Sequence, residues 1–181
     1  MKPKKSVGVF CGASESVDEH WFDLASALGE LIASQNIRLV YGGGRVGLMG
    51  RMADSCLAAG GEVCGVITDK LMEMEVGHAG LTSLEIMPTM SSRRDRMVAL
   101  SDTFVALPGG VGTLDELFEV IALRDLKYHS KSIGLLNAFG YYDELLCFLE
   151  KASVEGFVTE KSLSSLVVES DLKKLFLSLH F

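Results

Sequence analysis

Short apolar runs alternate with amphipathic segments along most of the chain. The runs are rich in valine, isoleucine and leucine and are bounded by glycine or polar residues, which is typical of buried parallel strands. They predict strands at Ser6–Cys11, Ile37–Tyr41, Glu62–Ile67, Leu84–Met87, Thr103–Leu107 and Ser132–Leu136. Helical spacing of apolar residues predicts helices at Asp18–Gln35, Leu48–Ala59, Met90–Ser101, Leu114–Ile121 and Tyr141–Glu155, and one or two short helices in Thr159–Phe181.

This alternation of strands and helices defines the fold class. Strands separated by helices form a parallel sheet that is covered on both faces. We therefore predict an α/β fold, a single doubly wound, Rossmann-like domain over residues 1–181, with Thr68–Gly80 as a polar, methionine-rich connection. Ligands in such folds bind beyond the carboxyl ends of the strands. Three predicted turns lie at that edge, namely Gly12–Ser14, Gly42–Gly50 and Pro108–Thr113.

The third turn joins the strand at 103–107 to the next helix. Pro108 ends the strand because it cannot donate to a sheet, and the glycines that follow let another group approach the backbone closely. Thr113 is expected to be the N-cap of the helix, with Glu116 completing a capping box. A glycine turn at a helix N-terminus favours an anion such as phosphate.

Glu116 lies close to this turn, and its residue type leaves two interpretations open. The apolar stripe of the helix consists of Leu114, Leu117, Phe118 and Ile121. Glu116 is therefore expected opposite the stripe, away from the sheet. A carboxylate repels a phosphate, so one interpretation gives Glu116 a chemical role further along the ligand. The other gives it only a capping and dipole role, together with Asp115.

Arg93, Arg94 and Arg96 form the densest positive charge in the chain. A run of charge on a helix is usually a solvated face. Two arginines at helical spacing can also clamp a phosphate or carboxylate through paired hydrogen bonds. Both interpretations stay open from the sequence.

The turn Gly42–Gly47 formally matches the GxGxxG pattern of dinucleotide sites. It follows the second predicted strand rather than the first, and only Asp69 lies near the place where a ribose-binding acid is expected. A dinucleotide site is therefore disfavoured. No lysine follows these glycines in the P-loop pattern, which disfavours an NTPase further.

The composition excludes several classes of partner. The chain of 181 residues has a formal net charge of −7, which argues against a nucleic-acid polymer or an anionic membrane surface. No apolar run is long enough to span a bilayer. The basic start of the chain is followed by a short segment broken by glycine, Val7–Ala13, which suits a first strand better than a signal peptide.

The cysteines and histidines show no metal-ligand or redox spacing. Cys11, Cys56, Cys64 and Cys147 lack any CxxC pair and sit in apolar contexts, so we expect buried free thiols and a cytoplasmic protein. We expect no metal and no cofactor. A phosphate cradle, an arginine pair and a lone carboxylate remain, and these suit cleavage of a phosphorylated glycoside.

Three motifs resemble one known family. Pro108–Glu116 (PGGVGTLDE) fits the pattern PGGxGTxxE, and it occurs with Tyr41–Gly50 (YGGGRVGLMG) and Met90–Met97 (MSSRRDRM). Together they resemble the Lonely Guy family of cytokinin-activating nucleoside 5′-monophosphate phosphoribohydrolases, often mislabelled as lysine decarboxylases. The resemblance continues from Val9–Ser14 to Val154–Phe157, and so covers nearly the whole chain.

The resemblance implies roles for individual residues. Arg93 and Glu116 would be the catalytic pair. The 5′-phosphate would lie on Gly109–Thr113 with the turn Gly43–Gly47 nearby, and Glu75 would contact the substrate. The implied substrate-binding set is Ser14, Gly43, Gly44, Gly47, Glu75, Arg94, Gly109, Gly110, Val111, Gly112, Thr113 and Asp115.

The resemblance also implies a small-molecule partner and a homodimer. The partner would be a purine nucleoside 5′-monophosphate, either AMP or an N6-modified AMP. A carboxylate facing away from the sheet needs a cover from water, so a second copy is expected at or beside Met90–Ser101 and the helix after Pro108. The chain departs from the usual family pattern at Arg94, Val111 and Ala122, and the last two bear on which base is accepted.

Two alternative functions remain at this stage. The same turns and arginines would serve a nucleotide-binding module that senses AMP without turnover. A dinucleotide oxidoreductase is weaker, for the reasons given above. Lysine decarboxylation has no support, because no lysine stands in a recognisable pyridoxal-phosphate setting.

Overall fold

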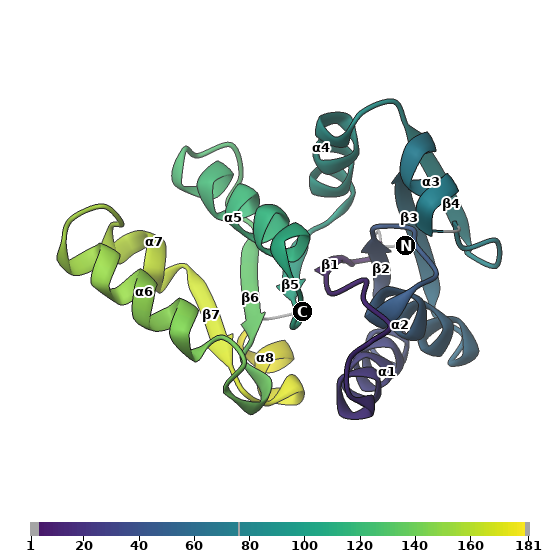
Figure 1. Cartoon of the computed structure of the whole chain (residues 1–181), viewed down its shortest axis with the longest axis horizontal. Coiled ribbons are helices and arrows are strands. Elements are labelled where there is room, and N and C mark those ends of the chain that lie inside the picture. Colours follow the sequence, from purple (N-terminus) through teal and green to yellow (C-terminus); the bar gives the residue numbers. More distant parts are fainter. Residues whose placement is uncertain (1–3, 76, 180–181) are drawn as a thin grey trace.

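The protein is built on one sheet of seven parallel strands, which we describe from a computed structural model for residues 4–75 and 77–179 (Figure 1). The strands are β1 (Ser6–Phe10), β2 (Arg38–Tyr41), β3 (Glu62–Thr68), β4 (Ser83–Met87), β5 (Thr103–Ala106), β6 (Ser132–Leu136) and β7 (Leu166–Glu169). Their spatial order is β4-β3-β2-β1-β5-β6-β7. The predicted parallel α/β fold is confirmed.

Helices cover both faces of the sheet (Figure 1). One face packs against α1 (Glu19–Ser34), α2 (Gly47–Ala58) and α8 (Leu172–Ser178). The other packs against α4 (Met90–Leu100), α5 (Val111–Asp125) and α6 (Asp143–Val154). The shorter elements are α3 (Asp69–Glu75), the 3₁₀ turn η1 (Ala138–Gly140) and α7 (Glu160–Ser164). None of the helices in the described ranges is long and apolar enough to cross a membrane.

The two-sided cover explains the continuous apolar runs in the sequence. Neighbouring residues of a strand point to opposite faces, so Val9 joins the α1–α2 side of the core and Phe10 the α4–α5 side. The same division separates Val105 from Phe104 in β5. Fully burying a side chain of this size contributes about 1.5–3 kcal/mol, so each face gains from a continuous run.

Two elements differ from the prediction. The tail contains β7 as well as two short helices, because its LVVE run pairs with β6 at the edge of the sheet. The connection Thr68–Gly80 contains α3, which begins where the Thr68 hydroxyl accepts the Leu71 amide at 3.3 Å. Neither segment has a strong hydrophobic periodicity, so the sequence did not predict either element. Pairing with β6 determines β7, and the Thr68 cap starts α3.

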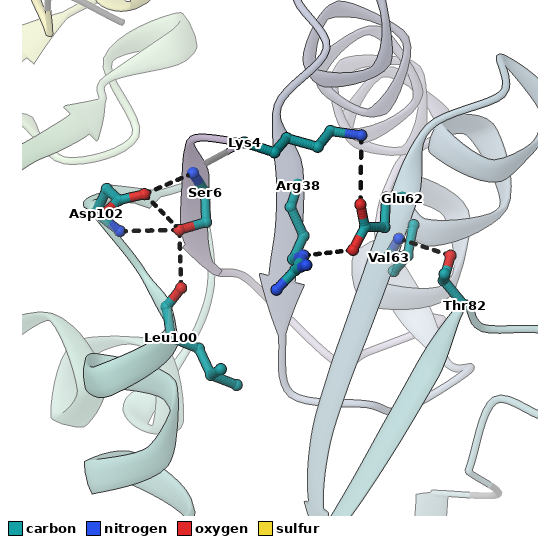
Figure 2. Close-up of polar contacts among 8 residues, drawn as sticks. All are labelled: Lys4, Ser6, Arg38, Glu62, Val63, Thr82, Leu100 and Asp102. Carbon is teal, nitrogen blue, oxygen red and sulfur yellow. Dashed lines mark hydrogen bonds and ion pairs between the residues drawn. The ribbon is translucent and has the colours of Figure 1, made fainter. Parts of the chain in front are cut away.

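The amino-terminal edge of the sheet is held by a set of polar contacts far from the turns (Figure 2). The Ser6 hydroxyl lies within hydrogen-bond distance of two acceptors, Leu100 O at 2.8 Å and the Asp102 carboxylate at 2.7 Å. Leu100 ends α4, so these bonds tie the end of that helix to β1. On the neighbouring strands, Arg38 pairs with Glu62 at 2.5 Å. The position of α4 is thus fixed from the edge opposite the candidate site.

The order in which the strands are added to the sheet reverses at the boundary between the neighbouring strands β1 and β5. Strands β1 to β4 step outward to one side, and β5 to β7 step outward to the other. The carboxyl ends of β1 and β5 therefore meet at a topological switch point, where open parallel sheets bind ligands.

Candidate active site

A cavity of about 570 Å³ lies at this switch point. Its walls come from the turn after β1, the turn after β5, the start of α2, helix α4 and the segment before α6. The lining residues that enter the argument below are Cys11, Gly12, Ser14, Trp21, Arg93, Gly109, Gly110, Gly112, Thr113, Asp115, Glu116 and Tyr141.

Main-chain hydrogen bonds hold the turns in register. The Gly12 amide donates to Pro108 O at 3.1 Å, which joins the turn after β1 to the turn after β5. The Leu48 amide donates to Gly12 O at 3.0 Å, which adds the start of α2. Gly47 has a φ of +60°, and a Cβ there would lie 2.5 Å from the Ala13 carbonyl carbon. The glycine is therefore needed where α2 meets the turn.

Helix α5 begins at this junction without a side-chain cap. Its N-cap is Gly110, not Thr113 as predicted, and Thr113 is buried in the first turn. A Cβ on Gly109 would lie 2.1 Å from the Thr113 hydroxyl, so glycine lets the turn close against it. The first helical bond runs from Leu114 N–H to Gly110 O at 3.1 Å, which leaves the preceding amides for water or an anion.

Arg93 and Glu116 meet at the wall of the cavity. Arg93 Nη1 donates to Glu116 Oε1 at 2.8 Å, and Arg93 Nε donates to Val66 O at 2.9 Å. The two side chains are only 6% and 14% exposed. Gly42 makes room for this arginine, because a Cβ there would lie 2.4 Å from Arg93 Nη2. The sequence analysis did not assign that role to Gly42.

The predicted direction of Glu116 is wrong. Its side chain turns toward Arg93 on α4 and lines the cavity instead of facing away from the sheet. Three members of the predicted apolar stripe, Leu114, Leu117 and Ile121, pack into the core, whereas Phe118 is exposed. Starting α5 at Val111 places Thr113, Leu117 and Val120 on the buried side. The capping box is absent because the N-cap is Gly110, which has no side chain, rather than Thr113.

Burial governs the ionisation of this carboxyl group. Burial raises the pKa of Glu116 above its ordinary value, and the ion pair with Arg93 offsets part of that effect. Burial, with the added charge of Glu116, also raises the pKa of the Cys11 thiol in the same cavity. Cys11 is therefore an uncharged thiol and lacks the thiolate that a nucleophile needs.

The three arginines of α4 diverge. Arg93 turns into the cavity, whereas Arg94 pairs with Asp115 at 3.0 Å. Arg96 pairs with Glu85 on β4 at 2.6 Å. Neither a solvated face nor a clamp by Arg93 and Arg96 describes this arrangement. Arg93 and Arg94 pair with separate carboxylates of α5, and Arg96 pairs with one of β4.

The structure separates the other predicted site residues into two groups. Those that line the cavity are Ser14, Gly109, Gly110, Gly112, Thr113 and Asp115. Those that are not among its described lining residues are Gly43, Gly44, Gly47, Arg94 and Val111. Gly43 and Gly44 face β3 and Gly77, and Val111 is 86% exposed. Glu75 ends α3, and its side chain lies outside what the structure describes.

An aromatic wall that the sequence did not reveal closes one side of the cavity. Trp21 of α1 and Tyr141 pack edge to face with ring centroids 5.5 Å apart. The Tyr141 hydroxyl donates to Gly109 O at 2.9 Å, which ties this wall to the glycine turn. In the sequence, both residues fall within predicted helices, Trp21 in Asp18–Gln35 and Tyr141 at the start of Tyr141–Glu155. Their position depends on contacts between distant segments.

The thiols match the prediction in part. All four cysteines are free, and Cys11, Cys56 and Cys64 are buried. Cys147 is exposed on α6, because its helix presents that side to solvent, so the expected burial is wrong there. Among the residues that the structure describes, no cluster of histidine, cysteine or acidic side chains could hold a metal ion.

Comparison with known proteins gives a consistent assignment. The family model described as "Possible lysine decarboxylase" matches residues 49–179. A cytokinin riboside 5′-monophosphate phosphoribohydrolase from Rhodococcoides fascians is 45% identical over 170 residues, covering 93% of this chain and 86% of the relative. A protein of the same name from Arabidopsis thaliana is 42% identical over 171 residues, covering 94% of this chain and 80% of the relative.

Solved structures share the fold at lower identity. The molybdenum cofactor binding protein from Rippkaea orientalis superposes with a TM-score of 0.74 at 22% identity, with full coverage of both chains. At that identity the likeness concerns the fold alone. The sequence relatives and the family model instead cover most of the chain, including α4 and α5. The chain therefore belongs to the Lonely Guy family, the cytokinin riboside 5′-monophosphate phosphoribohydrolases whose family model carries the description of a possible lysine decarboxylase.

Proposed function

We propose that this protein, as a single cytoplasmic domain, hydrolyses the N-glycosidic bond of a purine nucleoside 5′-monophosphate. The products are a free base and ribose 5-phosphate. The observation that carries the proposal is the buried Arg93–Glu116 pair beside an uncapped helix N-terminus in one cavity. The relatives named as phosphoribohydrolases support the same reaction.

The 5′-phosphate binds at the N-terminus of α5 in this proposal. The amides before Leu114 and the Thr113 hydroxyl provide donors, and the helix dipole favours a negative charge there. Gly110 and Gly112 leave open space, since an added Cβ would meet nothing within 4 Å at either position. The phosphate oxygens can therefore approach the backbone directly.

Glu116 and Arg93 act on the sugar. Cleavage of the glycosidic bond develops positive charge on the ribose, which a carboxylate in a water-poor site stabilises strongly. Ionised Glu116 supplies that charge and orients the attacking water. Arg93 keeps the carboxylate ionised and positions the substrate, because it is itself fixed by Val66 O. No metal or cofactor enters this mechanism.

The base occupies the less polar part of the cavity. Trp21 and Tyr141 form its aromatic side, and Leu71 and Met90 add aliphatic surface. Flat apolar walls suit a purine ring and tolerate an apolar N6 substituent. The proposed substrates are accordingly AMP and N6-modified AMP of the cytokinin type.

The test is a product assay over a matched panel. AMP, isopentenyl-AMP and the corresponding unphosphorylated ribosides are incubated with the protein, and free base is separated by chromatography. We expect free base from the monophosphates and little from the ribosides. Equal turnover of the ribosides would contradict the phosphate site. Binding of monophosphates without any hydrolysis would favour the non-catalytic nucleotide-binding module.

We also propose a homodimer, although the original reason for one no longer applies. Glu116 is covered by Arg93 within one chain, so no second copy is needed to exclude water from it. Support comes instead from apolar side chains exposed on α4 and α5, with Met90 42% and Val111 86% exposed. A partner at or beside these helices would bury them. An active species of 19.6 kDa in sedimentation at micromolar concentration would refute the dimer.

A further inference from the structure

We propose that Arg94 is a positioning residue that holds the acidic side chains around Glu116 and does not itself bind the substrate. The inference rests on the proposed function for its kinetic consequences. The geometry on which it stands concerns only α4 and α5.

Arg94 bridges two carboxylates of α5. Its Nη1 donates to Asp115 Oδ2 at 3.0 Å, and its Nε pairs with Glu119 Oε2 at 2.7 Å. These acids stand at i and i+4 on the helix and flank Glu116 in the sequence. Arg94 follows Arg93 directly, but its side chain leaves the cavity that Arg93 enters. The Arg94 guanidinium therefore joins α4 to α5 through two carboxylates, beside the Arg93–Glu116 pair.

The charges around Glu116 explain why the contacts of Arg94 affect the ionisation of Glu116. Arg93 and Arg94 lie near it on α4, Asp115 stands next to it on α5, and the uncharged Cys11 thiol lies near it in the turn after β1. Burial raises the pKa of Glu116 most strongly and Arg93 lowers it, while Asp115 and Arg94 add smaller effects that raise and lower it, respectively. Without Arg94, three carboxylates within two turns of α5 would be balanced by Arg93 alone.

The shape of arginine also contributes. The planar guanidinium donates a hydrogen bond to Asp115 through Nη1 while its Nε edge forms an ion pair with Glu119, so it contacts both carboxylates at once. A lysine at the same position would keep the positive charge but bond as a single point. Replacement of Arg94 by lysine therefore separates the effect of charge from the effect of the two-point bridge.

The experiment compares Arg94→Met with Arg94→Lys and with the control Arg96→Met. The control also removes an arginine–glutamate pair from α4, but Arg96 pairs with Glu85 on β4. Kinetics with AMP are measured across pH. We expect Arg94→Met to move the acidic limb of the kcat profile to higher pH, so that activity at the acidic end falls about tenfold more than on the plateau. Arg94→Lys keeps the charge but not the two-point contact, so it should move the limb in the same direction but less than Arg94→Met. Arg96→Met should keep the wild-type limb.

A second readout does not depend on turnover. The ¹³C signal of the Glu116 carboxyl group, assigned through Glu116→Gln, is followed by NMR during pH titration of the unliganded protein. Its midpoint should move to higher pH in Arg94→Met and stay in place in Arg96→Met. If the methionine variant does not fold, Arg94→Gln repeats the comparison. An unchanged midpoint in a folded variant would overturn the proposal.

The substrate-binding alternative gives a different pattern. If Arg94 binds the phosphate, Arg94→Met raises KM for AMP at every pH and leaves the shape of the profile unchanged, which would overturn the positioning role. If the wild type hydrolyses no monophosphate at all, the proposed function fails. The NMR titration then still decides whether Arg94 controls the ionisation of Glu116.

Discussion

Arg93 and Glu116 lie on different helices, yet their guanidinium and carboxylate groups are joined by a 2.8 Å hydrogen bond at the wall of the cavity. Both side chains are almost fully removed from solvent. A buried pair of this kind adds little net stability, because the desolvation of two charges offsets their attraction. Its retention beside the glycine turns fits a chemical role better than a structural one.

Replacement of the carboxylate tests that role directly. Glu116→Gln keeps the shape of the side chain and an acceptor for Arg93 but removes the negative charge. We expect kcat for AMP to fall by about 10²–10⁴, while calorimetric binding of AMP stays within about tenfold, since the phosphate contacts remain. Glu85→Gln is the control, because Glu85 pairs with Arg96 away from the cavity. Equal losses in both variants would contradict a catalytic Glu116.

The pH dependence of stability follows from the raised pKa of Glu116. A carboxyl group whose pKa is higher in the folded chain stabilises the fold when it is protonated. This contribution is complete below the ordinary glutamate pKa of about 4.3 and is lost as pH rises through the folded-state value. As pH rises through that range, the melting temperature of the wild type should therefore fall relative to that of Glu116→Gln. If the melting temperatures of the wild type and Glu116→Gln differed by a constant amount from about pH 4 to 8, this would contradict a raised pKa for the buried Glu116.

Activity should change in the opposite direction over the same window. The proposed mechanism needs ionised Glu116, so kcat/KM rises with pH as the carboxyl group loses its proton. Because the pKa of Glu116 is raised, this limb should lie above the ordinary glutamate range. A profile of kcat/KM for AMP, recorded together with melting temperatures, measures both trends. If the acidic limb of the kcat/KM profile lay at or below the ordinary pKa range of glutamate, the prediction would be contradicted.

Replacement of two glycines near the start of α5 by alanine should change the melting temperature in opposite directions. In Gly109→Ala the new methyl group would lie 2.1 Å from the Thr113 hydroxyl, so we expect lower melting temperature and weaker AMP binding. In Gly112→Ala the methyl group meets nothing within 4 Å, and alanine stabilises a helix by about 0.5–1 kcal/mol. Gly112→Ala should therefore melt higher, while its methyl group hinders the phosphate. Equal melting temperatures for the two variants would contradict this account.

His78 should stabilise the segment after α3. Its Nε2–H donates to Asp54 at 2.9 Å, and its Nδ1 accepts the Gly80 amide at 3.1 Å. We expect His78→Ala to lower the free energy of unfolding by about 1–3 kcal/mol in urea titration, because the buried His78 side chain loses its bonds to both Asp54 and Gly80. Amide exchange in α3 should accelerate. Asp54→Asn keeps an acceptor for Nε2–H and should cost less, and an equal cost would contradict the hydrogen-bond explanation.

The sequence by itself determined the parallel α/β fold, because both signals for it are local. Runs such as Phe104–Leu107 are apolar on both faces, and glycine, proline or a polar residue follows each run. The motif at Pro108–Glu116, together with Tyr41–Gly50 and Met90–Met97, also carried the resemblance to the family. Each of these features depends only on neighbouring residues.

Only the tertiary structure decided which side chains meet. Glu116 turned toward α4 because Arg93 is held by Val66 O, an acceptor 27 residues away in the chain. Likewise, Arg94 left the cavity because Asp115 and Glu119 approach it from α5. Helical periodicity gives the direction of a side chain but not the charge that approaches from another helix. The electrostatics of buried pairs therefore required the packed structure.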